Sequence, residues 1–157
     1  MTDATERAAT DRAHRVSEHI QPGSVSVVRT GTRTFEGMNE RGSTVLIGPA
    51  DAEGHFTPGE LFKLALAGCA GMSADRVGAR RLGDDFEMTV WAHGHSRDDN
   101  RYARIDEELL VDLSAQEPDE RTKLIEIMVK AIDRGCTVAR SVAGSIELDT
   151  TIDGTSV

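Results

Sequence analysis

The chain has 157 residues and a net charge of −9, with 38% apolar and 29% charged residues. This length and composition predict a single soluble globular domain with its own core. The acidic balance argues against nucleic acid as a partner, because an acidic surface repels phosphate backbones. No apolar run approaches the roughly 18 residues of a membrane span, and the N-terminus lacks the apolar core of a signal peptide. We therefore predict a cytoplasmic protein that binds neither nucleic acid nor membrane.

The N-terminal third of the chain predicts an arm followed by two strands. Residues 1–22 are polar with apolar residues on one helical face, which is typical of a short amphipathic arm or of a frayed tail. Pro22-Gly23 ends this segment, so we place the domain at residues 23–157. Residues 24–37 and 43–48 are rich in Val and Thr and partly alternate, which predicts one strand each.

A long helix is predicted from Thr57 to Leu82, and the rest of the chain is organised around it. Thr57 is a candidate N-cap, Pro58 a first helical residue, and Glu60 completes a capping box. The first half of this helix is apolar on nearly all sides, which predicts burial on several sides. Cys69 lies about three turns into the helix.

The remainder of the chain predicts a hairpin, a second helix and a last strand, at residues 86–95, 102–113, 117–135 and 145–152. The resulting order is β-β-α-β-β-α-β, an α+β pattern without regular βαβ alternation.

The chain has only two cysteines, Cys69 and Cys136. A cysteine in an apolar helix is by default a small buried hydrophobe. A nucleophilic cysteine instead needs a cation or a helix N-terminus to stabilise its thiolate, and Cys69 is too far along its helix to gain much from the helix dipole. Arg33 and Arg29, on the first predicted strand, are candidates for the cation, although an exposed strand edge is the more common place for such residues.

Cys136 lies between the end of one predicted helix and the start of another, where a helix N-terminus would lower its pKa. Arg140 could add positive charge there. Two such cysteines suit peroxide chemistry, in which one thiolate becomes a sulfenic acid and the other condenses with it to a disulfide. An external reductant then resets the pair. Glu60 is either only a helix cap or a carboxylate that holds an arginine over Cys69.

The histidines do not predict a metal site. His93 and His95 share one face of a strand, and His55 precedes the long helix. Two histidines and two distant cysteines lack the tight spacing of a zinc site, and no glycine-rich phosphate loop is present. We predict neither a metal nor a cofactor.

Two stretches, TPGELFKLALAGCAGM and GCTVARSVAG, resemble the paired motifs of the OsmC/Ohr family of osmotically inducible and organic-hydroperoxide-resistance proteins. In the family, a proline and a glutamate open a helix that leads to a reactive cysteine, and the second cysteine precedes Pro-Val-Ser. The resemblance covers residues 24–152. It implies an intertwined homodimer in which two long helices pack centrally and strands of antiparallel sheet wrap around them.

The resemblance also implies that the cysteine pair reduces organic hydroperoxides at the dimer interface. Cys69 would be the peroxidatic residue and Cys136 the resolving one. An arginine from the first strand region, Arg33 or else Arg29, would pair with Glu60 and activate the thiolate. A dithiol, or a lipoyl group in some members, would restore the enzyme.

The chain departs from the hydroperoxide-reducing members at two positions. Gly59 stands where their glutamate follows the proline, so Glu60 lies about 100° further round the helix, as in the broader OsmC-like branch. Thr137 replaces the proline of the second motif. The leading hypothesis is a homodimeric thiol peroxidase in oxidative stress defence. The alternatives are a non-enzymatic OsmC-like dimer that binds a small apolar ligand, and an ordinary α+β domain with structural cysteines.

Overall fold

The computed structural model describes residues 15–157, which form two compact units that divide between Leu61 and Phe62. Most of the arm predicted over residues 1–22 lies outside the described residues, and residues 15–22 form turns and irregular chain. None of the described helices combines the length and apolar character that a bilayer crossing requires.

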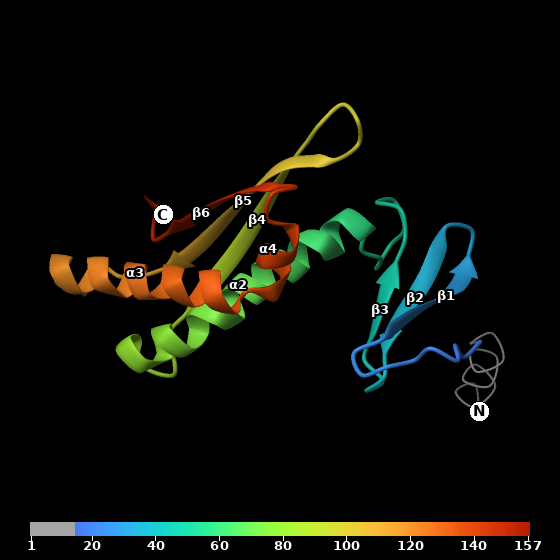
Figure 1. Cartoon of the computed structure of the whole chain (residues 1–157), viewed down its shortest axis with the longest axis horizontal. Coiled ribbons are helices and arrows are strands. Elements are labelled where there is room, and N and C mark those ends of the chain that lie inside the picture. The colour runs from blue at the N-terminus through green and yellow to red at the C-terminus, as the bar shows by residue number, and fades with distance from the viewer. Residues whose placement is uncertain (1–14) are drawn as a thin grey trace. The chain divides into compact units, whose positions relative to one another are not determined.

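The first unit is built on a three-stranded antiparallel sheet of order β1-β2-β3 (Figure 1). Its strands are β1 (Val25–Gly31), β2 (Thr34–Asn39) and β3 (Thr44–Ile47). The stretch that we predicted as one strand is therefore a hairpin, which turns at Thr32 and Arg33. Arg33 takes the left-handed conformation, with φ of 59°, that glycine or asparagine usually supplies in such turns. The turn was missed because the sequence places an arginine there.

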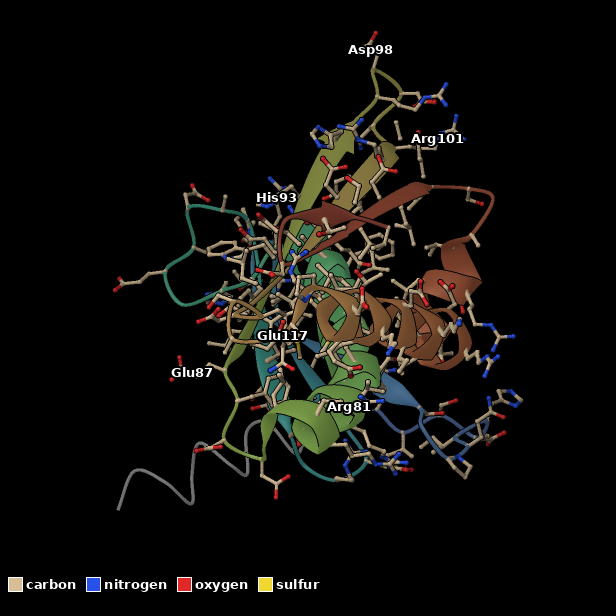
Figure 2. The ribbon with its side chains drawn as sticks, turned by 90° about the vertical axis from the view of Figure 1, so that its left-hand side faces the viewer. Arg81, Glu87, His93, Asp98, Arg101 and Glu117 are labelled. Atoms are coloured by element: carbon tan, nitrogen blue, oxygen red, sulfur yellow. The ribbon has the colours of Figure 1, made fainter. Side chains whose placement is uncertain are left out.

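The second unit contains a four-stranded sheet of order β4-β5-β6-β7. The predicted hairpin is confirmed as β4 (Met88–Ser96) and β5 (Tyr102–Val111), and Figure 2 shows Asp98 and Arg101 at its far tip. The last strands are β6 (Glu147–Ile152) and β7 (Thr155–Ser156).

One pairing in this sheet contradicts the predicted antiparallel arrangement. β5 and β6 run parallel, with Glu107 opposite Thr150. A parallel neighbour needs a crossover connection, and the helices between these two strands supply it.

Three helices complete the α+β fold that was predicted: α2 (Pro58–Leu82), α3 (Pro118–Gly135) and the short α4 (Thr137–Val142). The structure thus divides the first predicted strand into β1 and β2, confirms the second as β3, and adds the short α4, whose start was predicted at Cys136, and β7 to the predicted element order. In the second unit, α2 and α3 lie on one side of the sheet (Figure 1).

α2 and α3 run antiparallel. Near the end of α2, Arg81 lies 3.3 Å from Glu120 in the first turn of α3. The other end of α3 approaches the middle of α2, where a Cβ placed on Gly135 would lie 3.2 Å from Ser73 Oγ. The glycine therefore permits the close approach of the two helices at this point.

The core of the second unit lies between these helices and the sheet. β5 contributes every second residue to it, since alternate side chains of a strand point to opposite faces. The fully or nearly fully buried apolar members are Ala70, Ala74, Leu109, Val111, Leu113, Leu124, Ile125, Met128, Ile132, Cys136 and Ile152.

Candidate functional site

Cys69 lies on the core side of α2 and is half-buried. Ser73, one turn later, donates a hydrogen bond from its Oγ to the Cys69 carbonyl at 2.8 Å. Because Ser73 is also the residue that Gly135 approaches, Cys69 lies next to the junction at which α3 ends.

Cys136 forms that junction and is fully buried. It is the C-cap of α3 and the N-cap of α4. Its own N–H donates to the Ile132 carbonyl at 2.8 Å, and its Sγ accepts a hydrogen bond from the Ala139 N–H at 3.4 Å. The predicted helix N-terminus at Cys136 is therefore present.

The two thiols, both free, are neighbours. Cys69 packs against the core cluster that contains Cys136, and its side chain acts directly on the Cys136 thiol. The fold thus brings together two cysteines that lie far apart in the sequence.

A third ionisable side chain, Glu107 of β5, lies close enough to Cys136 to act on its thiol. It is 2% exposed, and its Oε1 has no hydrogen-bond partner among the described residues. Burial raises the pKa of Glu107 to about 7, because desolvation disfavours the charged form. Its charge in turn acts on the Cys136 thiol.

Glu107 was missed in the sequence. The available signal was a carboxylate at an inward position, between Ile105 and Leu109 in an alternating strand.

The pKa of Cys136 is raised to about 11, and the main cause is burial. The Ala139 N–H lowers it, whereas the neighbouring Cys69 and Glu107 side chains raise it further. The prediction of a lowered pKa is therefore wrong, because burial outweighs the helix N-terminus. Arg140 does not compensate, since its guanidinium donates to the Arg134 carbonyl at 3.4 Å on the surface.

Glu60 forms the predicted capping box with Thr57. The Thr57 N–H donates to the Glu60 carboxylate at 2.8 Å, and the Glu60 N–H donates to Thr57 Oγ1 at 3.2 Å. This reciprocal pair satisfies two of the unpaired donors at the start of α2. The capping role of Glu60 is confirmed, and its pairing with an arginine stays a prediction.

The two candidate arginines belong to the first unit, whereas Cys69 belongs to the second. Arg33 is exposed in the β1–β2 turn and not on a strand, which corrects its predicted place. Arg29 is exposed on β1, opposite Phe35. Among the described residues, neither is paired with Glu60.

The histidines are engaged in local contacts. His93 Nε2 lies 3.4 Å from Glu108, and His95 Nε2 lies 2.7 Å from Asp106. His55 Nδ1 lies 2.8 Å from the Glu53 carbonyl. Within the described part of the chain, no three ligating side chains gather as a metal site would require.

Comparison with known proteins identifies the family. The family model described as "OsmC-like protein" matches residues 50–151. The chain belongs to the OsmC-like family. An uncharacterised protein of Mycobacterium tuberculosis and one of Mycobacterium bovis are each 47% identical to this OsmC-like chain over 116 residues, which is 73% of this chain and 85% of theirs.

Solved structures share the fold. An OsmC-like protein of Vibrio cholerae superposes with a TM-score of 0.65 at 17% identity, covering 85% of this chain and 99% of that one. The organic hydroperoxide resistance protein OhrB of Bacillus subtilis superposes with a TM-score of 0.53 at 15% identity, covering 82% and 96%. These likenesses place the α2, α3 and sheet arrangement within the OsmC-like fold.

Proposed function

We propose that this protein is a cysteine-based peroxidase that reduces organic hydroperoxides in oxidative stress defence. The observation that supports the proposal is the adjacency of Cys69 and Cys136 across the α2–α3 junction. Membership of the OsmC-like family and the likeness of the fold to that of a protein named for organic hydroperoxide resistance also support this proposal.

The two cysteines have different roles in this proposal. The half-buried Cys69 thiolate attacks the distal peroxide oxygen, so the O–O bond breaks, ROH leaves after protonation and Cys69 becomes a sulfenic acid. Cys136, a buried thiol with a raised pKa, then displaces the sulfenic oxygen as water and forms the disulfide. A dithiol or lipoyl-type reductant reopens the bond by exchange.

The thiolate of Cys69 needs a cation, and we assign this role to Arg33, or else to Arg29, with Glu60 as its carboxylate partner. Binding of ROOH and reductant requires no metal or cofactor in this scheme.

A homodimer is part of the proposal. Leu64 and Met72 are 51% and 82% exposed on α2, and a Cβ on Gly68, halfway between them, would meet no atom within 4 Å. Residues spaced by four lie on one helical face, so this apolar, uncrowded stripe suits the α2 helix of a second copy.

The test is a thiol count after the reduced protein is mixed with cumene hydroperoxide. The wild-type protein should lose both thiols, and the Cys69→Ser variant should keep its single remaining thiol, Cys136. In the Cys136→Ser variant, Cys69 should stop at a sulfenic acid that dimedone traps. Steady-state peroxide consumption with dihydrolipoamide, compared with dithiothreitol, then tests the class of reductant. Two intact thiols in the wild-type protein at excess peroxide would refute the proposal.

The alternative is a non-enzymatic dimer that binds a small apolar ligand. One observation favours it: a fully buried cysteine whose pKa is raised to about 11 is typical of an unreactive core thiol. In that case, the thiols stay reduced and the apolar ligand protects the protein against thermal unfolding.

A further inference from the structure

Glu107 is buried although its Oε1 has no hydrogen-bond partner within residues 15–157. Its row on β5 is otherwise apolar, with Ile105, Leu109 and Val111 buried on the same face. Its partners across the sheet are Ala92 of β4 and Thr150 of β6. A buried carboxyl without a hydrogen-bond partner costs folding free energy. Such groups cluster at functional sites, where the cost is offset by chemistry.

The ionisable group on which Glu107 acts is the Cys136 thiol at the α3–α4 junction. The same thiol interacts with Cys69 of α2, so Cys136 links the carboxyl to the second cysteine. The facing positions of β4 and β6 carry no ionisable group.

Other charges of the sheet lie on its opposite face. Arg104, Asp106 and Glu108 alternate with Glu107 along β5 and pair with one another or with His93 and His95. The pKa of Glu107 is raised by burial alone. No charged side chain among the described residues therefore changes this pKa appreciably.

We propose that Glu107 carries the proton from the Cys136 thiol to the sulfenic oxygen of Cys69 while the disulfide forms. This inference rests on the proposed peroxidase function and concerns its second step.

The step balances without a further reactant. The Glu107 carboxylate accepts the proton as the Cys136 S–H bond breaks and the S–S bond forms. The S–O bond of the sulfenic acid breaks, and its hydroxyl takes that proton and leaves as water. Cys136–SH and Cys69–SOH thus give the disulfide and water, and Glu107 ends as it began.

Cys136 needs a base to remove its proton because the thiol is buried. A thiol whose pKa is raised to about 11 is almost fully protonated at neutral pH, and the thiolate is the nucleophile. A carboxyl whose pKa is about 7 is well matched to accept its proton near pH 7.

The experiment separates the two steps in rapid-mixing, single-turnover reactions of the full chain with cumene hydroperoxide. Peroxide loss reports Cys69 oxidation, and quenched mass spectrometry reports disulfide formation. The variants are Glu107→Gln, which has nearly the same shape, and Glu107→Asp, which keeps a carboxyl. Glu108→Gln is the matched control, because Glu108 lies next along β5 on the opposite face.

In Glu107→Gln, disulfide formation should slow about 10²-fold, a typical contribution of a positioned acid–base group, while peroxide loss stays unchanged. The wild-type rate of disulfide formation should rise with pH through an inflection near 7. That inflection should vanish in Glu107→Gln and persist in Glu107→Asp and Glu108→Gln.

Disulfide formation in Glu107→Gln within threefold of wild type, with the same pH profile, would overturn the role of Glu107 and leave the peroxidase proposal standing. Absence of Cys69 oxidation in the wild-type protein would overturn both. If Glu107→Gln does not fold, the wild-type pH profile decides, because a rate that is flat between pH 6 and 8 contradicts the proposal.

Discussion

Replacement of Glu107 by glutamine should stabilise the folded protein at alkaline pH and leave it nearly unchanged at acidic pH. Glu107 is 2% exposed, and burial raises its pKa from 4.5 to about 7. Because the pKa is higher in the folded state, folding favours the protonated carboxyl. The stability associated with that proton is fully present below pH 4.5 and is lost as the pH rises through about 7.

The size of this stability difference follows from the rise in the pKa of Glu107 from 4.5 to about 7. A tenfold change in an equilibrium constant is worth about 1.4 kcal/mol, so ionisation of Glu107 lowers the free energy of unfolding by up to about 3 kcal/mol at pH 8. Glutamine has nearly the same shape and no charge, and it avoids this loss. The stability difference between Glu107→Gln and wild type should therefore grow between about pH 4.5 and pH 7 and then level off.

Urea denaturation of both proteins at a series of pH values, at one protein concentration, measures this difference. Other carboxylates titrate in both proteins, and their contributions cancel in the comparison. Asp106 is one of these, since His95 and Arg104 hold its pKa below the ordinary value. A difference that stays constant within about 0.5 kcal/mol from pH 5 to pH 8 would show that Glu107 is not desolvated in solution.

Three substitutions test the packing that holds the site in place, each by chemical denaturation. Thr57→Ala should destabilise by about 1 kcal/mol through loss of the α2 cap, whereas Thr57→Ser should not; equal effects would contradict the capping box. Gly78→Ala should cost about 1–3 kcal/mol, because its Cβ would lie 2.5 Å from the Phe86 ring. Phe86→Leu should relieve this cost in the double variant, and additive effects would argue against the clash. Met128→Ala should cost about 2–5 kcal/mol, since Met128 is fully buried in the core, and a cost under 1 kcal/mol would contradict that packing.

The sequence predicted the elements whose signals are local. The start of α2 could be predicted because Thr57, Pro58 and Glu60 form a cap whose chemistry depends only on neighbours in the chain. The β1–β2 turn could not be predicted, because Arg33 adopts a left-handed conformation that arginine rarely takes. The parallel β5–β6 pairing depends on the path of α3 and α4 over the sheet, which residue patterns do not encode.

The candidate site divides in the same way. The two motifs drew attention to Cys69 and Cys136, but only the antiparallel packing of α2 and α3 places them together. The sign of the Cys136 pKa shift was predicted wrongly, because a helix N-terminus is visible in the sequence and burial is not. Glu107 stands at an inward position of an alternating strand, between Ile105 and Leu109, but the strand pattern alone does not show that this position becomes almost fully buried beside Cys136.

Burial of Cys136 also determines which cysteine reacts first in the proposed mechanism. Two equally reactive neighbouring thiolates would compete for the hydroperoxide. A Cys136 thiol whose pKa is raised to about 11 leaves the first attack to Cys69. The same burial would stall the second step unless a base accompanies the thiol, and Glu107, whose charge acts on Cys136, is itself buried. One desolvated cluster would thus order the two steps, which predicts that the sulfenic acid of Cys69 accumulates when Glu107 is replaced, because the disulfide then forms more slowly.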